Sequence, residues 1–258
     1  MRLKTGIRLE SLRLSLRKAI DVAARLGTDA VEINARNEIR PQELSRTAVR
    51  HLKKLLSDRD LGICCLSYPT RRSFFDMEDL DRRLEGTRQA MSSAFDLGAR
   101  LVVGSPTTIP DPETETERFE TLIAAMTEIG KHGQRVGTNF ALSFLDAEDR
   151  IGALLEHLPP GVGVDFDPAD LIINSLSAEQ TLRSIASRVL QFRARDAVRD
   201  FSQGRGVVVQ LGRGSTDLPQ LLALLEENQF DGHMVMEATG DDPEISCAHS
   251  IEYLKSLF

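Results

Sequence analysis

The chain has 258 residues, of which 41% are hydrophobic and 28% charged, and its net charge is −7. These values are typical of a soluble globular protein, and no run approaches the roughly 20 apolar residues of a membrane helix. The first ten residues lack the apolar segment of a secretory signal. An acidic chain is a poor partner for nucleic acid, because that affinity rests on Lys and Arg neutralising phosphates. We therefore expect binding to neither nucleic acid nor a membrane.

Short apolar runs typical of β-strands alternate with longer segments of helical periodicity. The runs end near eight positions, Leu9, Asn34, Leu66, Gly104, Ser143, Phe166, Ala194 and Glu237. Alternation of this kind predicts a parallel sheet. Eight units in a chain of this length favour an α/β fold with a single (β/α)8 TIM barrel over residues 1–258. An open doubly wound sheet is the alternative, but no GxGxxG follows the first strand.

The chain has three cysteines, Cys64, Cys65 and Cys247. The count is odd, the first two are adjacent in an apolar run, and no CxxC occurs. We interpret them as buried, reduced thiols, which predicts a cytoplasmic protein.

Polar residues follow the apolar runs, where a barrel of parallel strands carries its active site. They include Arg8, Glu10, Glu32, Asn34, Ser67, Ser105, Ser143, Asp165, Asp167, Arg193, Arg195, Asp196 and Glu237. Such groups cost free energy at the ends of apolar strands unless they are paired or hydrated, so their clustering favours a functional site. A salt-bridge ring or solvated loops are the alternative. No histidine falls at a strand end, which argues against histidine acid–base chemistry or a zinc site.

Five segments, taken together, carry a family resemblance. They are residues 25–32, 163–170, 193–197, 211–217 and 230–237. Their order and spacing resemble the xylose isomerase-like TIM barrels, the sugar phosphate isomerase/epimerase superfamily that also contains AP endonuclease family 2. The resemblance implies a Mn²⁺, Mg²⁺, Co²⁺ or Zn²⁺ site, with proton transfer by two glutamates, and a homo-oligomer.

The family's metal ligands are Glu on strand five, Asp on strand six, His on strand seven, Glu on strand eight and a second His after the Asp. This chain keeps Asp167 and Glu237, which would be the ligands if a metal binds. At the strand-five position it has Ser143 or a near neighbour, since no Glu occurs from Val136 to Leu145, and at the two histidine positions it has Arg193 and Asp170. Arginine has no lone pair for a metal and stays protonated. We therefore expect a degenerate, metal-free site in which Arg193 bridges Asp167 and Glu237.

In such a site, Glu237 is the candidate base, and Asp167 orients Arg193. Asp170 is the candidate second acid. Arg193, or the family's substrate-binding arginine kept as Arg199, would stabilise an oxyanion. The alternative is an ion-pair cluster in an inactive relative.

Further substrate contacts are expected from the strand ends and two loops. These are Glu32, Ser143, Arg195 and Asp196, Arg71 and Arg72 in the loop 68–75, and Arg213 in the loop 212–215. The first loop is either a lid or a packed loop, and Arg71 and Arg72 would hold an anionic substrate. The second either presents backbone N–H groups to a phosphate or is a tight turn.

We expect an isomerase or epimerase that acts on a sugar, polyol or sugar phosphate. A non-catalytic carbohydrate-binding or regulatory relative is the alternative. An AP endonuclease-like nuclease ranks last, because it needs a histidine-rich metal site and a basic face.

Overall fold

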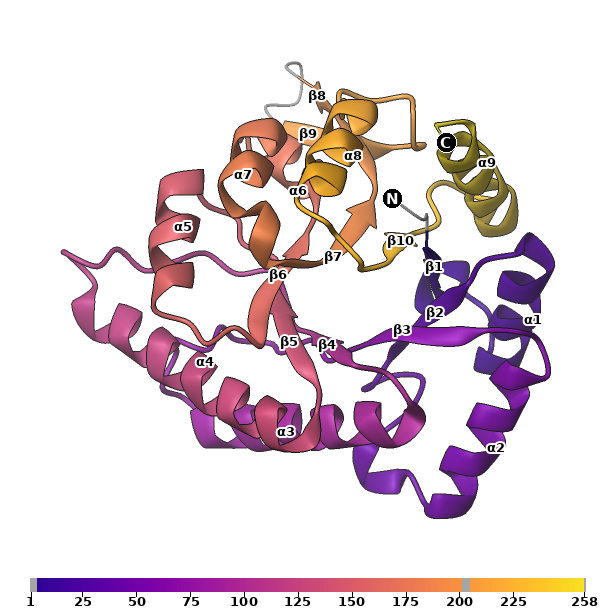
Figure 1. Ribbon diagram of the computed structural model, residues 1–258, viewed down its shortest axis with the longest axis horizontal. Helices are drawn as coiled ribbons and strands as arrows, with labels where there is room; N and C mark the ends of the chain where they lie inside the picture. Colours follow the sequence, from indigo (N-terminus) through magenta and orange to yellow (C-terminus); the bar gives the residue numbers. More distant parts are fainter. Residues whose placement is uncertain (1–3, 201–204, 258) are drawn as a thin grey trace.

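The computed structural model describes residues 4–200 and 205–257, and these form an α/β barrel (Figure 1). Eight parallel strands close in the order β1-β10-β7-β6-β5-β4-β3-β2. They are β1 (Thr5–Arg8), β2 (Ala30–Asn34), β3 (Gly62–Ser67), β4 (Leu101–Val103), β5 (Asn139–Leu142), β6 (Val162–Phe166), β7 (Val189–Ala194) and β10 (Met234–Met236). The predicted strand ends agree with these bounds to within one residue, and the TIM barrel is confirmed.

Helices connect successive strands and surround the barrel. They are α1 (Leu16–Leu26), α2 (Arg46–Ser57), α3 (Leu80–Leu97), α4 (Thr116–Val136), α5 (Glu148–Glu156), α6 (Pro168–Ile173), α7 (Ala178–Ile185), α8 (Leu218–Glu227) and α9 (Pro243–Ser256), with short 3-10 turns at Leu9–Leu12, Pro41–Glu43 and Ala186–Arg188. Gly27 and Gly98 adopt left-handed conformations that end α1 and α3, at φ of 69° and 93°. Residues with a Cβ rarely adopt this conformation, so glycine suits both positions.

One antiparallel hairpin lies outside the barrel. It consists of β8 (Asp196–Asp200) and β9 (Arg205–Val209) and packs against α6. The apolar run of residues 207–211 predicts a short hairpin strand, and β9 begins and ends two residues before that run.

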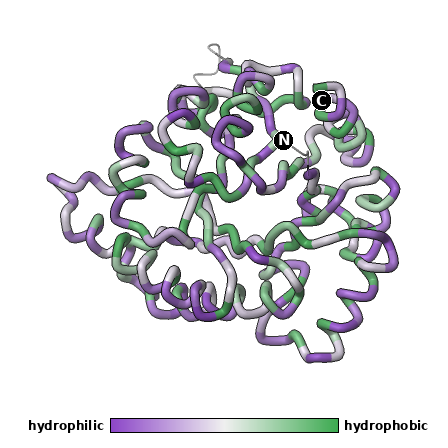
Figure 2. The backbone as a smooth tube through the Cα atoms, viewed as in Figure 1, coloured by the Kyte–Doolittle hydropathy of each residue, from purple (hydrophilic) through white to green (hydrophobic). Residues whose placement is uncertain are grey.

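The core lies between the barrel and its helices, where Phe140, Phe166 and Phe192 are fully or almost fully buried. Figure 2 shows hydrophobic residues along the strands and hydrophilic ones over much of the outer helices. The three cysteines are free and buried. Within the described ranges, none of the helices combines the length and hydrophobicity that crossing a bilayer requires.

Candidate functional site at the barrel mouth

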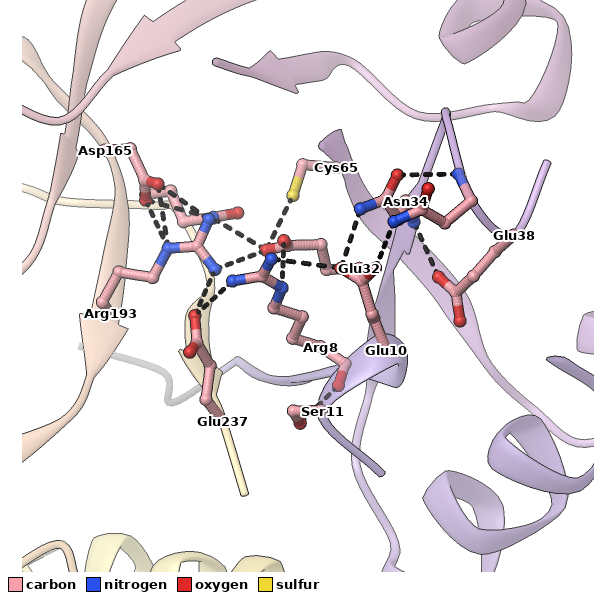
Figure 3. A network of polar contacts seen from close by, with 12 residues as sticks. Arg8, Glu10, Ser11, Glu32, Asn34, Glu38, Cys65, Asp165, Arg193 and Glu237 are labelled. Atoms are coloured by element: carbon pink, nitrogen blue, oxygen red, sulfur yellow. Dashed lines mark hydrogen bonds and ion pairs between the residues drawn. The ribbon is translucent and has the colours of Figure 1, made fainter. Parts of the chain in front are cut away.

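A cavity of about 220 Å³ opens at the carboxyl ends of the strands. Its polar lining consists of Arg8, Glu32, Ser67, Ser105, Ser143, Asp165, Asp167, Asp170, Arg193, Arg195 and Glu237. Most of the polar strand ends picked out in the sequence therefore do converge, and the exceptions in this lining are Glu10, Asn34 and Asp196. Figure 3 shows part of the network that joins them.

Arg193, on β7, lies at the centre of this network and is only 6% exposed. Its Nε donates to both oxygens of Asp165, at 3.1 and 2.8 Å. Its Nη1 donates to Glu32 at 2.7 Å and to Glu237 at 3.3 Å. Burial alone would lower the pKa of Arg193, but the three carboxylates raise it well above its ordinary value. The structure thus holds a permanent positive charge among carboxylates from three other segments.

The predicted bridge from Arg193 to Asp167 is wrong, because the strand-six partner of Arg193 is Asp165. A register shift between Val164 and Asp165 pairs Asp165 with Gln191 on β7. Gln191 Nε2 donates to Asp165 at 3.1 Å, so both side chains project to the same side. Arg193 is two residues beyond Gln191 and projects to that side as well, because strand side chains alternate.

Arg195 makes the contacts expected of Arg193. Its Nη1 donates to Asp167 and, at 3.1 Å, to Asp170, and its Nε lies 3.7 Å from Glu237 Oε2. Two parallel pairs therefore form, Asp165 with Arg193 and Asp167 with Arg195. Arg195 therefore bridges Asp167 and Glu237, the two acidic residues that this chain shares with the family's metal ligands.

Asp167 also begins helix α6. Its Oδ1 accepts from the backbone N–H groups of Ala169 and Asp170, at 3.0 and 3.2 Å. Burial raises the pKa of Asp167 to about 7, with Asp170 and Glu237 adding to the effect and Arg195 opposing it.

Glu237 has the opposite electrostatic environment. It accepts from Arg8 at 3.0 Å as well as from Arg193, and Arg195 is close. Burial would raise the pKa of Glu237, but these arginines together lower it below its usual value. Near neutral pH, Glu237 is therefore ionised while Asp167 titrates.

The wall on the β1–β2 side fixes Arg8. Glu10 accepts from Arg8 at 3.2 Å, from Asn34 at 2.7 Å and from Asn37 at 2.6 Å. Beside it, burial raises the pKa of Glu38 to about 7 (Figure 3).

Some buried polar atoms of the mouth have no hydrogen-bond partner among the described residues. They include Ser67 Oγ, Glu32 Oε1 and Gln191 Oε1, although Arg8 Nε lies 3.6 Å from Glu32 Oε1. Ser67 and Glu32 line the cavity, as does the predicted Ser143. Unsatisfied buried polar atoms are costly, so a ligand hydroxyl that reaches them gains free energy.

The described side chains do not fit the family's divalent metal. Among them, no group of three or more His, Cys, Asp or Glu side chains is placed to hold an ion. The guanidinium groups of Arg193 and Arg195 lie between the carboxylates and offer only N–H donors.

Asp196 does not contact the mouth, which corrects its predicted role. Its buried carboxylate accepts from the backbone N–H groups of Ala197, Gly212, Gly214 and Thr216, at 2.8 to 3.1 Å. These include the N–H groups proposed for a phosphate, so the loop 212–215 already holds an anion of its own. Arg213 in this loop is exposed and outside the mouth lining.

Three other predicted substrate arginines also lie outside the mouth. Arg199, on β8, lines a separate cavity of about 520 Å³ beside α7 and α8. Arg71 and Arg72 line a cavity of about 1160 Å³ beside α3.

The predicted site residues omitted Asp165, Arg8 and Gln191. Asp165 and Arg8 do occur among the polar strand ends, and only that position in the sequence could have indicated that they belong to the site. Gln191 is a polar residue inside a strand, two positions before Arg193, and that spacing places both on one face.

Comparisons with known proteins agree with this fold. Residues 20–257 match the model of the xylose isomerase-like TIM barrel family. The chain belongs to this family. No curated protein matches it.

Solved structures of the same fold include a xylose isomerase domain protein from Planctomyces limnophilus, with a TM-score of 0.86 and 17% identity over 100% of this chain and 98% of that one. A xylose isomerase-like TIM barrel protein from Mycobacterium smegmatis, in complex with magnesium, has a TM-score of 0.80 and 18% identity over 100% and 98%. The 3-keto-D-glucoside 4-epimerase from E. coli has a TM-score of 0.76 and 15% identity over 99% and 100%. At these identities the likeness shows the fold alone.

Proposed function

We propose that this xylose isomerase-like barrel binds a sugar or polyol at its mouth. It would transfer a proton at a carbon next to a carbonyl, as an isomerase or epimerase. The observation that carries the proposal is Arg193, a buried cation held by Asp165, Glu32 and Glu237, at the position where the family resemblance implies a histidine ligand of the metal.

Two carboxyl groups with pKa values moved apart are suited to the chemistry. Ionised Glu237 accepts the proton from the C–H bond, and the electron pair of that bond moves toward the carbonyl oxygen. N–H groups of Arg195 or Arg8 stabilise the oxyanion that forms. Asp167, whose pKa is about 7, is partly protonated near neutral pH and donates a proton to carbon from the side of the mouth on which it lies.

A non-catalytic carbohydrate-binding protein is the second candidate. It is favoured by the arginines around Glu237, because a carboxylate with a lowered pKa is a weak base. The nuclease alternative has less support, because no histidine of the described residues lines the mouth.

Hydrogen–deuterium exchange separates the two candidates. The protein is incubated in D2O with D-fructose, D-tagatose and their phosphates, and loss of the C–H signal is followed by NMR. We expect exchange that Glu237→Gln and Asp167→Asn abolish and that Glu244→Gln preserves, since Glu244 pairs with Arg25 on the exposed surface. Saturable sugar binding without exchange would identify the non-catalytic protein instead.

Metal content tests the role of Arg193. The protein is incubated with Mn²⁺, Mg²⁺, Co²⁺ and Zn²⁺, desalted and examined by elemental analysis. We expect no stoichiometric metal and exchange that persists in EDTA. A stoichiometric ion that Glu237→Gln removes would overturn the replacement of the metal by Arg193.

A further inference from the structure

A second cavity, which we call the arginine groove, adjoins the mouth. It is lined by the segment after β2, the segment after β3 and the first half of α3, and its volume is about 1160 Å³. Pro69 lines both this groove and the mouth cavity. Pro69 therefore forms part of the wall of both spaces.

The arginine groove and the mouth have opposite charge. The groove has three acidic side chains and six arginines, which are Arg36, Arg40, Arg71, Arg72, Arg82 and Arg83. The mouth has five acidic side chains and three arginines. The groove is therefore a positive region in a chain whose net charge is −7.

Some of these arginines form ion pairs with acidic residues of the same chain. Arg40 pairs with Glu43, and Arg72 pairs with Asp76 and Glu78. These contacts order the rim of the groove.

Buried Arg83 stabilises the wall. Its guanidinium donates to the backbone carbonyls of Asp76 and Glu78. It therefore fixes the turn that precedes α3 and is not free to bind a ligand.

Three arginines remain available. Arg36, Arg71 and Arg82 are exposed, and within the described ranges their guanidinium groups form no hydrogen bond or ion pair. The Arg36 guanidinium lies 4.2 Å from the centre of the Tyr68 ring, which holds its plane by a cation–π contact and leaves its N–H groups free. A planar guanidinium with free N–H groups binds the paired oxygens of a phosphate or carboxylate.

We propose that the arginine groove binds the anionic end of an elongated sugar or polyol whose carbonyl end occupies the mouth. The inference rests on the proposed function. Because acidic side chains dominate the mouth, an anionic substituent is repelled there and attracted next to Arg36, Arg71 and Arg82. The ligand is therefore a sugar that carries a phosphate or a carboxylate at a distance from its carbonyl.

Titration with inorganic phosphate, followed by calorimetry, tests the groove by itself. We expect wild-type protein to bind phosphate and the double variant Arg71→Gln/Arg82→Gln to bind it at least tenfold more weakly. The matched control is Arg46→Gln/Arg50→Gln, which removes two exposed arginines of α2 outside the groove lining. Equal affinity in wild type and Arg71→Gln/Arg82→Gln would overturn the proposal.

A second arm uses the deuterium exchange assay with D-fructose, D-fructose 6-phosphate and D-glucuronate. We expect Arg71→Gln/Arg82→Gln, the groove variant, to raise KM for one of the two anionic sugars and to leave KM for D-fructose unchanged. The sugar whose KM rises shows whether the groove binds a phosphate or a carboxylate. Exchange with unchanged KM for both anionic sugars would refute the groove while the proposed function stands. Loss of phosphate binding in the groove variant, with no exchange of any sugar in wild type, would support the groove and refute the proposed function.

Discussion

Two buried charges three residues apart, Arg193 and Asp196, are neutralised in different ways. Arg193 is neutralised by the side chains of Asp165, Glu32 and Glu237, and it lines a cavity. Asp196 is neutralised by four backbone N–H groups and lines none of the cavities described above. At the end of one strand, therefore, Arg193 lies in a site that a ligand can enter, and Asp196 lies in a site that the protein itself fills.

The two environments differ in whether a ligand can enter. A Cβ on Gly214 would lie 2.2 Å from Asp196 Oδ1, so the loop packs against the carboxylate with no room for another group. Around Arg193, Glu32 and Ser67 line a cavity, and their Oε1 and Oγ atoms have no hydrogen-bond partner among the described residues. A buried charge that backbone groups satisfy completely is structural, whereas one in a partly satisfied side-chain network is suited to binding.

Replacing the central cation gives the largest expected effect. Arg193→Met leaves Asp165 and Glu32 buried without their cation, and we expect a loss of about 3–5 kcal/mol in the free energy of unfolding. Urea denaturation measures it.

Arg25→Met is the matched control for that variant, because the Arg25–Glu244 pair is exposed and should contribute less than about 1 kcal/mol. Adding Asp165→Asn and Glu32→Gln to Arg193→Met should recover part of the loss. Equal stability of Arg193→Met and Arg25→Met would contradict the account of a buried ion-pair centre.

Removing the other charge should change stability without changing the site. Asp196→Ala leaves four backbone N–H groups without their acceptor, so we expect a loss of about 2–4 kcal/mol. Sugar binding, measured by calorimetry well below the melting temperature, should be unchanged. If Asp196→Ala abolished sugar binding while still folded, the loop 212–215 would belong to the site after all.

The pH dependence of stability follows from Asp167. Its folded pKa of about 7 lies above its unfolded value of about 3.9, so the folded state binds more protons between these values. This group therefore makes stability fall as pH rises from about 4 to 7. Asp167→Asn should flatten that part of the profile, measured as melting temperature against pH. A profile with the wild-type slope in this variant would place the pKa of Asp167 in its ordinary range.

Much of the barrel was predictable because its signals are local. Apolar runs end at Asn34, Phe166 and Ala194 in the sequence and in the structure, since each end coincides with a change from apolar to polar residues. The convergence of these ends then follows from the topology of a parallel barrel.

The pairing inside the site was not predictable in the same way. Whether Arg193 faces Asp165 or Asp167 depends on the register shift beside Val164, which no sequence pattern indicates. The role of Asp196 depends on a loop 16 to 20 residues further along the chain folding back onto it. Both are tertiary contacts, and alternation and spacing inform only on local structure.

The smallest expected effect separates a binding hydroxyl from a structural one. Ser67 Oγ has no partner within the described residues, whereas Ser246 Oγ donates to Gln210 at 2.9 Å and accepts from Thr239 N–H at 2.9 Å. Ser67→Ala removes an unsatisfied group, so stability should stay within about 1 kcal/mol of wild type, while sugar affinity falls by roughly two- to tenfold. Ser246→Ala should lose stability and leave affinity unchanged. Thermal unfolding and calorimetry on both variants measure the two quantities, and a loss of stability confined to Ser67→Ala would mean that its hydroxyl holds the barrel together instead of meeting a ligand.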